Sequence, residues 1–338
     1  MLNIISRSVV SSRTTGPGKV VKNLIAGLEK IGQPFVVNAS LDACTHVWVH
    51  DDIEALMAVA KRPDIKAVVG PNLYITPRQI PTSIDLSRFI YLHPSPWVVD
   101  LWREQGYVRS PLFPWPTGID VAAFPSSPLE KKHVLIYFKE RFPEELEYAK
   151  QLLTTLKIPY EVLVYGSYRE EDYRRLLSAA TYVLWIGRQE SQGIALQEAL
   201  ATNTPILVWD VPSLGHWQAS KKSMAIFSPW ENAFTGATAA YYFDARCGLK
   251  FTAKAELESK LLQMETAYKS FSPRSYVTDT LSLEKQARDL LAIFTTHLKA
   301  TEEELKDPKV KTTAKWRNGT VWFRALQSAK DAVRRLIS

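Results

Sequence analysis

Short apolar runs alternate with segments of helical periodicity along most of this chain. Apolar runs of about four to eight residues are typical of strands in a parallel sheet, and residues 19–31 place apolar side chains on one side of a helix. In the first half, the expected strands are 2–5, 35–38, 46–49, 65–69, 89–92 and 112–115, and the expected helices are 19–31, 51–61 and 96–104. This alternation predicts a parallel sheet with helices on its faces.

The same alternation starts again after residue 120. The expected strands are 133–138, 161–165, 182–186 and 205–209, and the expected helices are 143–156, 170–180, one after Gly193, 256–270 and 283–297. Between the two halves, PWPTGID (114–120) combines two prolines and a glycine, which predicts a stiff turn. We therefore predict an α/β protein with two doubly wound lobes, residues 1–120 and 121–300, followed by an extension at 301–338.

Composition places the chain among globular proteins, with 46% hydrophobic and 23% charged residues in a length of 338. The two cysteines, Cys44 and Cys247, do not form a disulfide framework and indicate a reducing, cytoplasmic setting. No apolar run has the length of a membrane helix, and residues 1–13 are expected to contain a first strand rather than a signal peptide.

Charge is distributed unevenly along the chain. The formal net charge is +7, and residues 301–338 contain nine Lys/Arg and five Asp/Glu. Within this tail, residues 321–337 are amphipathic and basic, so they are expected either to dock at a membrane surface or, as we prefer, to pack back across the lobes. No nucleic-acid-binding motif accompanies the basic residues, so no nucleic-acid partner is expected.

The stretch 188–210 carries the clearest candidate chemistry. Glu190 and Glu198 flank Gly193 where a predicted strand passes through a loop into a helix. Free backbone N–H groups at a helix start favour an anion, and carboxylates accept hydrogen bonds from sugar hydroxyls. Together these groups suit a nucleotide-sugar, and the alternative is a surface helix with two solvated glutamates.

This stretch and three others resemble the retaining glycosyltransferases of the GT-B architecture, family four. The matching positions are Glu190, Ser191, Gly193, Glu198, Ala199, Ala201 and Pro205, with the further segments 14–28, 91–106 and 116–124. The resemblance implies two Rossmann-like lobes facing a central cleft, with the acceptor on the first lobe and the nucleotide-sugar on the second.

The resemblance also implies roles for individual residues. Glu190 would hold hydroxyls of the transferred sugar, and Glu198 would hold the ribose. The other residues expected to bind the sugar donor are Ser191, Gln192, Gly193, Ile194, Gly16 and Gly18. Lys139 and Arg141, in YFKERF, would neutralise the diphosphate, although they lie closer together than is usual in the family. Their alternative is an ion pair with Glu140 or Glu144 at a helix start.

Two positions depart from the family pattern. The strand at 65–69 ends in Gly70-Pro71-Asn72 where many members have a histidine, so Asn72 and His93 are the acceptor-side candidates. His93 has a structural role as its alternative. The spacing of His50-Asp51-Asp52 is poor for metal ligands, and GPGK (16–19) lacks the residues of a phosphate-binding P-loop.

The expected function is therefore transfer of a sugar, with retained configuration, from a nucleotide-diphosphate donor to a hydroxyl of a glycan or glycoconjugate. Neither a metal nor a cofactor is expected, because basic residues and helix dipoles can stabilise the leaving diphosphate. Two alternatives remain open. One is a nucleotide-sugar epimerase or phosphorylase on the same fold, and the other is an inactive binding protein at a membrane or nucleic acid.

Overall fold

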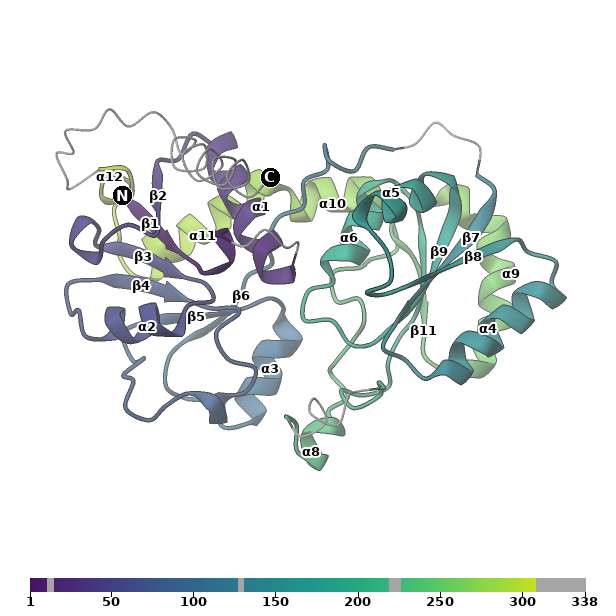
Figure 1. The fold of residues 1–338 in the computed structure, drawn as a ribbon, viewed down its shortest axis with the longest axis horizontal. Coiled ribbons are helices and arrows are strands. Elements are labelled where there is room, and N and C mark those ends of the chain that lie inside the picture. Colours follow the sequence, from purple (N-terminus) through teal and green to yellow (C-terminus); the bar gives the residue numbers. More distant parts are fainter. Residues whose placement is uncertain (11–14, 127–130, 219–225, 308–338) are drawn as a thin grey trace, which may run out of the picture. The chain divides into compact units, whose positions relative to one another are not determined.

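The computed structural model describes residues 1–10, 15–126, 131–218 and 226–307. The predicted tail helix at 321–337 lies outside these ranges, so its packing or membrane docking stays a prediction. The chain forms two compact units. Of the described residues, those within 1–92, 108–118 and 283–307 form the first unit, and those within 93–107 and 119–282 form the second (Figure 1). Each unit holds its own parallel sheet, which confirms the predicted α/β fold class with two Rossmann-like lobes.

The first unit is built on a six-stranded sheet in the order β2-β1-β3-β4-β5-β6. Its strands are β1 (Leu2–Ile5), β2 (Phe35–Val37), β3 (His46–Val49), β4 (Lys66–Val69), β5 (Ile90–His93) and β6 (Leu112–Pro114). Its helices are α1 (Gly16–Lys30), α2 (Ile53–Ala60), α11 (Leu283–His297) and α12 (Glu302–Lys306). Thr15 caps α1 and Asp52 caps α2 through their side-chain oxygens, which satisfies N–H groups that the helices leave free.

Helix α11 belongs to the first unit because it packs closely against α1. Gly27 lies at this contact, where an added Cβ would come within 2.4 Å of the Leu283 carbonyl oxygen. The indole of Trp115 also donates to the Gln286 carbonyl oxygen at 2.9 Å. Residues 1–120 and 121–300 were expected to form the two lobes. In the structure, the chain returns to the first unit at residue 283, and residues 93–107 belong to the second unit.

The second unit is built on a five-stranded sheet in the order β11-β10-β9-β7-β8. Its strands are β7 (His133–Lys139), β8 (Tyr160–Val164), β9 (Ala180–Gly187), β10 (Ile206–Trp209) and β11 (Gly248–Phe251). Its helices are α3 (Pro96–Glu104), α4 (Pro143–Thr155), α5 (Glu170–Ala179), α6 (Ile194–Ala201), α8 (Pro229–Asn232), α9 (Leu257–Ala267) and α10 (Pro273–Leu281). Among the helices in all the described ranges, none combines the length and apolar character needed to cross a bilayer.

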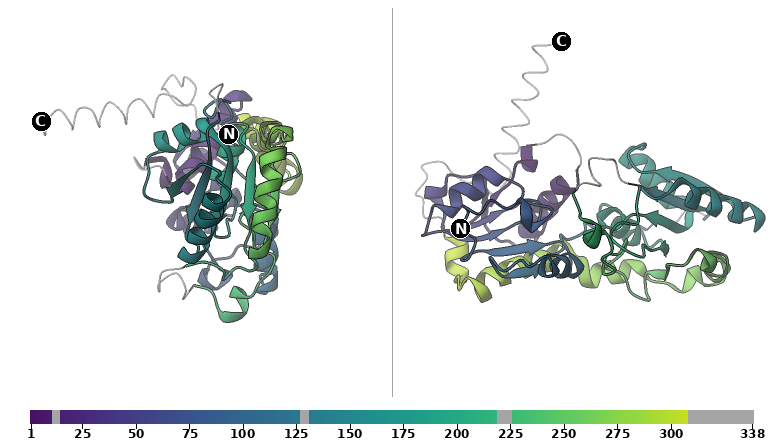
Figure 2. Two further views of the ribbon diagram at one scale, coloured as in Figure 1. Left: turned by 90° about the vertical axis from the view of Figure 1, so that its right-hand side faces the viewer. Right: turned by 90° about the horizontal axis from the view of Figure 1, so that it is seen from below.

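Helices cover both faces of the second sheet (Figure 2). Apolar residues of α4 and α9 pack on one face, with alternate β7 residues such as Val134 and Ile136. Residues of α5, α6 and α10 pack on the other, with Leu135 and Tyr137. Counted within the unit, the strand order is 2-1-3-4-5, so the direction of winding reverses between β7 and β9. Open parallel sheets of this kind bind ligands beyond the carboxyl ends of the strands at that reversal.

Candidate functional site

Two of the predicted site residues meet where β7 and β9 end side by side. Lys139 is the last residue of β7 and lies in register with Gly187, the last residue of β9. The Arg188 N–H continues the pairing by donating to the Lys139 carbonyl oxygen at 2.9 Å. Lys139 Nζ lies 2.5 Å from Glu190 Oε1, and the two side chains are only 11% and 13% exposed. The winding reversal of the second sheet therefore holds a shielded ion pair that still reaches solvent.

The loop that carries Glu190 is held by neighbouring segments. Its backbone N–H donates to the Thr238 carbonyl oxygen at 3.0 Å, and its own carbonyl oxygen accepts from the Trp97 indole at 3.1 Å. Asp210, directly after β10, fixes the Thr238 segment by accepting from the Thr238 hydroxyl and the Ala239 N–H, both at 2.6 Å. Asp210 is thus a positioning residue for Glu190, and nothing in the sequence motif indicated it.

Gly193 starts α6 in a conformation that favours glycine. Its φ of 85° and ψ of 47° are in the left-handed region, whereas an added Cβ would meet no atom closer than 3.6 Å. No side chain caps α6, and the Gln197 N–H is bonded to the Gly193 carbonyl oxygen at 3.0 Å. The N–H groups of residues 194–196 precede that first helical bond and have no acceptor within the helix. The start of α6 is therefore suited to an anion.

Glu198 is buried on α6, close to the hydroxyl groups of Tyr168 and Tyr173. Burial raises the pKa of both phenols, and the neighbouring Glu198 carboxylate contributes in the same direction. The Tyr173 hydroxyl donates to the Ala195 carbonyl oxygen at 2.7 Å, and the Tyr168 and Tyr137 hydroxyls lie 3.0 Å apart. The second predicted glutamate thus lies beside two phenols whose pKa burial raises.

The residues between the two glutamates shape the loop. Ser191 is exposed, whereas Gln192 is buried and its amide donates to Gln197 Oε1 at 2.9 Å. In return, the Gln197 amide donates to the Gln192 carbonyl oxygen at 3.0 Å. Ile194 is partly buried against the core beneath α6. These contacts hold the backbone of the loop independently of any ligand.

Arg141 is fully buried, in contrast to Lys139. Its Nε and Nη2 donate to the two carboxylate oxygens of Glu145 at 2.8 and 2.5 Å. Its Nη1 donates to the carbonyl oxygens of Gly187 and Trp209 at 3.1 and 3.0 Å. The guanidinium therefore connects the ends of β9 and β10 to the first turn of α4. The partner is Glu145, not the Glu140 or Glu144 of the sequence alternative.

Glu145 is also bonded to His216, to which the sequence analysis gave no role. His216 Nε2 lies 3.0 Å from Glu145 Oε1. Burial alone would raise the pKa of the Glu145 carboxyl, but the contacts with His216 and Arg141 outweigh burial and lower it. The Arg141–Glu145 pair is ionised and internally satisfied, as expected of a structural support beneath the loop.

Arg188 is a second basic residue at this edge that the sequence analysis did not single out. Its Nε lies 2.5 Å from Glu140 Oε2, and its guanidinium lies over the Trp217 ring, 5.3 Å from the centroid. The side chain is partly exposed, unlike Arg141. The signal that could have found it is its place directly after a buried strand and two residues before Glu190.

The remaining candidates lie elsewhere. Gly16 and Gly18 start α1 in the first unit, where the Gly18 N–H is capped by Thr15 Oγ1 at 3.1 Å. Asn72, also in the first unit, is exposed, and its Nδ2 lies 3.2 Å from His50 Nε2. His93 is buried edge-on against Trp102 with ring centroids 4.2 Å apart.

Burial lowers the pKa of His93 to about 3, which is the environment of a structural histidine. Across the described ranges, no group of three or more His, Cys, Asp or Glu side chains is arranged to hold a metal ion.

Neither a family model nor a curated protein matches this sequence. Among solved structures, the chain is similar to the sucrose-phosphate synthase from Thermosynechococcus elongatus, with a TM-score of 0.57 and 11% identity over 89% of this chain and 99% of that one. It is also similar to the apo form of the lipopolysaccharide outer core galactosyltransferase WaaB, with a TM-score of 0.52 and 10% identity over 87% and 99%. Likenesses at this level of identity show the fold alone. The chain has the GT-B fold, with two Rossmann-like parallel-sheet lobes.

Proposed function

We propose that this protein is a glycosyltransferase that moves a sugar from a nucleotide-diphosphate donor to a hydroxyl of a glycan or glycoconjugate. The observation that carries the proposal is the shielded Lys139–Glu190 pair at the winding reversal of the second sheet, where a ligand site is expected. The uncapped start of α6 follows Glu190 by only a few residues. One edge of this lobe thus offers a cation, backbone N–H groups without an acceptor in the helix, and carboxylates that can accept hydrogen bonds from sugar hydroxyls.

In this proposal, the diphosphate binds between Lys139 and the N–H groups at the start of α6. Both supply positive charge where negative charge develops as the diphosphate leaves. Arg188 adds a second cation when its guanidinium exchanges Glu140 for the diphosphate, two of whose oxygens it can hold in a bidentate contact. We propose that these groups act without a metal ion.

The two glutamates then recognise hydroxyl groups. When Lys139 turns to the phosphate, Glu190 is released to accept hydrogen bonds from the transferred sugar. We propose that Glu198, beside the phenols of Tyr168 and Tyr173, binds the ribose hydroxyls. Arg141 supports the site from below through Glu145, whereas Lys139 contacts the nucleotide-sugar.

Retention of configuration is proposed on the resemblance of the sequence. In such a same-face transfer, the bond from the anomeric carbon to the phosphate oxygen breaks as the bond to the acceptor oxygen forms. The acceptor hydroxyl gives its proton to the leaving phosphate. The protein's contribution is to hold both partners and to stabilise the diphosphate.

Proton NMR of a nucleotide-sugar, with and without an acceptor, tests the proposal. We expect release of the nucleoside diphosphate together with a glycoside of unchanged anomeric configuration. Glu190→Ala and Lys139→Ala should abolish transfer without unfolding the protein. Glu147→Ala and Lys150→Ala, which break an exposed ion pair of 2.9 Å on α4, are the matched controls.

Full activity of Glu190→Ala would show that the site assignment is wrong. Conversion of the donor sugar in the absence of any acceptor would identify an epimerase instead. Release of a sugar phosphate from an oligosaccharide and inorganic phosphate would identify a phosphorylase.

A further inference from the structure

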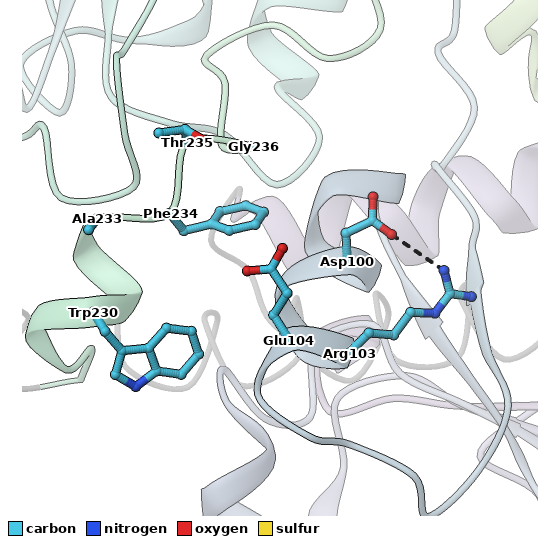
Figure 3. Close-up of a pocket in the computed structure, with 8 residues that line it drawn as sticks. All are labelled: Asp100, Arg103, Glu104, Trp230, Ala233, Phe234, Thr235 and Gly236. Carbon is cyan, nitrogen blue, oxygen red and sulfur yellow. Dashed lines mark hydrogen bonds and ion pairs between the residues drawn. The ribbon is translucent and has the colours of Figure 1, made fainter.

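A hollow of about 640 Å³ lies in the second unit, apart from the Lys139–Glu190 pair. One wall is the outer face of α3, with Asp100, Arg103 and Glu104. The other is formed by Trp230 of α8 and the segment 233–236 that follows it (Figure 3). Both walls belong to the same compact unit, so the hollow is a feature of one body.

Buried contacts fix the walls of the hollow. Glu231, fully buried on α8, accepts from the Gln105 amide at 2.6 Å and from the Ser228 N–H at 2.5 Å, which fastens α8 to the end of α3. On the inner face of α3, Trp97 packs against Phe234 with ring centroids 6.4 Å apart. The hollow is therefore formed by structure that the fold already stabilises, as ligand sites commonly are.

Aromatic rings line the hollow on the α8 side. The Trp230 side chain is 51% exposed and lies at the rim. The Phe234 ring covers Gly236, where an added Cβ would come within 2.4 Å of a ring atom. Glycine at 236 thus lets the ring lie against the backbone. A rigid, amphipathic indole on such a surface offers contact area at a low entropic cost.

Polar groups of both kinds surround these rings. The carboxylates of Asp100 and Glu104 are acceptors, and the Arg103 guanidinium and Thr235 hydroxyl are donors. Asp100 is paired with Arg103 at 3.3 Å. The Glu104 carboxylate makes no hydrogen bond or ion pair with the described part of the chain, and it points toward the aromatic rings (Figure 3).

This mixture favours a carbohydrate over an organic cation. The C–H face of a sugar ring can pack on Trp230, while its hydroxyls both donate to carboxylates and accept from Thr235 or Arg103. An ammonium group pairs with Glu104 but offers no acceptor to the Thr235 hydroxyl or the Arg103 guanidinium, whereas each sugar hydroxyl is both donor and acceptor.

Two hydrogen bonds to the backbone of Glu190 connect its loop to segments that line or adjoin the hollow. Trp97, behind the α3 wall, donates to the Glu190 carbonyl oxygen. Thr238, whose carbonyl oxygen accepts a hydrogen bond from the Glu190 N–H, follows Gly236 by two residues. At roughly 3.3–3.6 Å per residue, that span of backbone is at most about 7 Å. The hollow therefore adjoins the loop assigned to the sugar donor.

We propose that the hollow is a carbohydrate subsite, lined by Trp230 and Glu104, that binds the acceptor glycan away from its reacting hydroxyl. Its role as an acceptor subsite rests on the proposed function. Its binding of a saccharide does not, because the aromatic and carboxylate lining would bind sugar whether or not transfer occurs.

Saturation-transfer NMR on the full chain tests saccharide binding directly. The probes are glucose, galactose, N-acetylglucosamine, maltotetraose and chitotetraose, with choline and spermidine as cation probes. We expect at least one saccharide to bind, and Trp230→Ala to weaken it by about tenfold or more. Leu262→Ala, which truncates an equally exposed side chain on α9, should leave binding unchanged.

The proposal is overturned if no saccharide in this panel binds, or if binding survives Trp230→Ala. It is also overturned if choline or spermidine binds at Trp230 while the saccharides do not. With an active acceptor, Trp230→Ala should raise KM for long acceptors and leave kcat unchanged.

Nucleotide-sugar binding, measured by calorimetry on the same variants, separates the two proposals. Trp230→Ala should retain it, and Glu190→Gln should retain saccharide binding. If saccharides bind at Trp230 but no nucleotide-sugar binds, the proposed function fails and the subsite stands. If a nucleotide-sugar binds but no saccharide binds at Trp230, the subsite proposal fails and the proposed function stands.

Discussion

Replacing Lys139 or Arg141, the two basic residues at the end of β7, with methionine should have different effects: the first should weaken ligand binding and the second should lower stability. Lys139 and Arg141 lie two positions apart and were both expected to neutralise the diphosphate. In the structure, Lys139 faces Glu190 near solvent, whereas Arg141 is fully buried against Glu145. Replacing each with methionine removes the charge and keeps an unbranched apolar side chain. The pair therefore separates a ligand-binding role from a structural one.

The expected costs follow from what each change leaves unpaired. Arg141→Met leaves the shielded Glu145 carboxylate and the carbonyl oxygens of Gly187 and Trp209 without their donor. Removing one partner of a buried pair typically costs about 3–5 kcal/mol, and we expect the lower part of that range because His216 still contacts Glu145.

Lys139→Met leaves a carboxylate that still reaches solvent. The Glu190 side chain is 13% exposed, so the loss of the ion pair should cost about 1–2 kcal/mol of unfolding free energy. Its effect should fall on the ligand. Removing a cation that contacts a diphosphate should weaken nucleotide-sugar binding by at least about 30-fold.

Urea denaturation and calorimetry together measure both effects. Arg141→Met should lower the urea midpoint at an unchanged m-value, while the protein that remains folded binds the nucleotide-sugar with near wild-type affinity. Lys139→Met should shift the midpoint little and lose affinity. A stable Arg141→Met protein that no longer binds a nucleotide-sugar would refute this reasoning.

Three further outcomes are expected. Gly27→Ala should lower the unfolding free energy by about 1–3 kcal/mol in thermal denaturation, because its Cβ would collide with the Leu283 carbonyl and displace α11; an unchanged melting temperature would contradict this packing. His93, with its pKa lowered to about 3 by burial, stays neutral in the fold while the unfolded chain takes up a proton below about pH 6.5. The contribution of His93 to the unfolding free energy should therefore be fully present above about pH 6.5 and fall by up to about 1.4 kcal/mol per pH unit toward pH 3. His93→Gln should reduce that slope in urea titrations at different pH values. Asp210→Ala should lower kcat about tenfold by releasing Thr238, with Asp210→Asn recovering part of the loss in steady-state kinetics; equal kcat in both variants and wild type would exclude the positioning role.

Periodicity was sufficient to predict most of the fold. The helices at 96–104 and 283–297 have the predicted bounds, because apolar side chains recur at helical spacing in both and a proline stands at the start of the first. Strand β11 was missed, since its sequence GLKF is short and begins with a glycine at a φ of 136°. The lobe to which α11 belongs could not be predicted, because it depends on the contact of Gly27 with a residue more than 250 positions away.

The site was predicted as individual residues, without their pairing. Alternation along a strand would place Lys139 and Arg141 on one face, but β7 ends at Lys139 and Glu140 adopts a φ of 51°. That turn directs Arg141 into the core, which no periodicity indicates. Arg188 and Asp210 were missed because their positions depend on how neighbouring strand ends and loops meet in three dimensions.

Nucleotide-sugar binding by the second lobe is the central claim, and a thermal-shift series over UDP-, GDP-, ADP- and dTDP-sugars tests it most directly. A ligand at 100 times its Kd stabilises the native state by about 2.7 kcal/mol, which gives a clear rise in Tm. We predict that one nucleotide class raises the Tm, that Lys139→Met and Glu198→Gln lose the rise, and that Glu147→Ala keeps it. No rise with any of the four classes at millimolar concentration, or a rise that both site variants retain, would contradict the account.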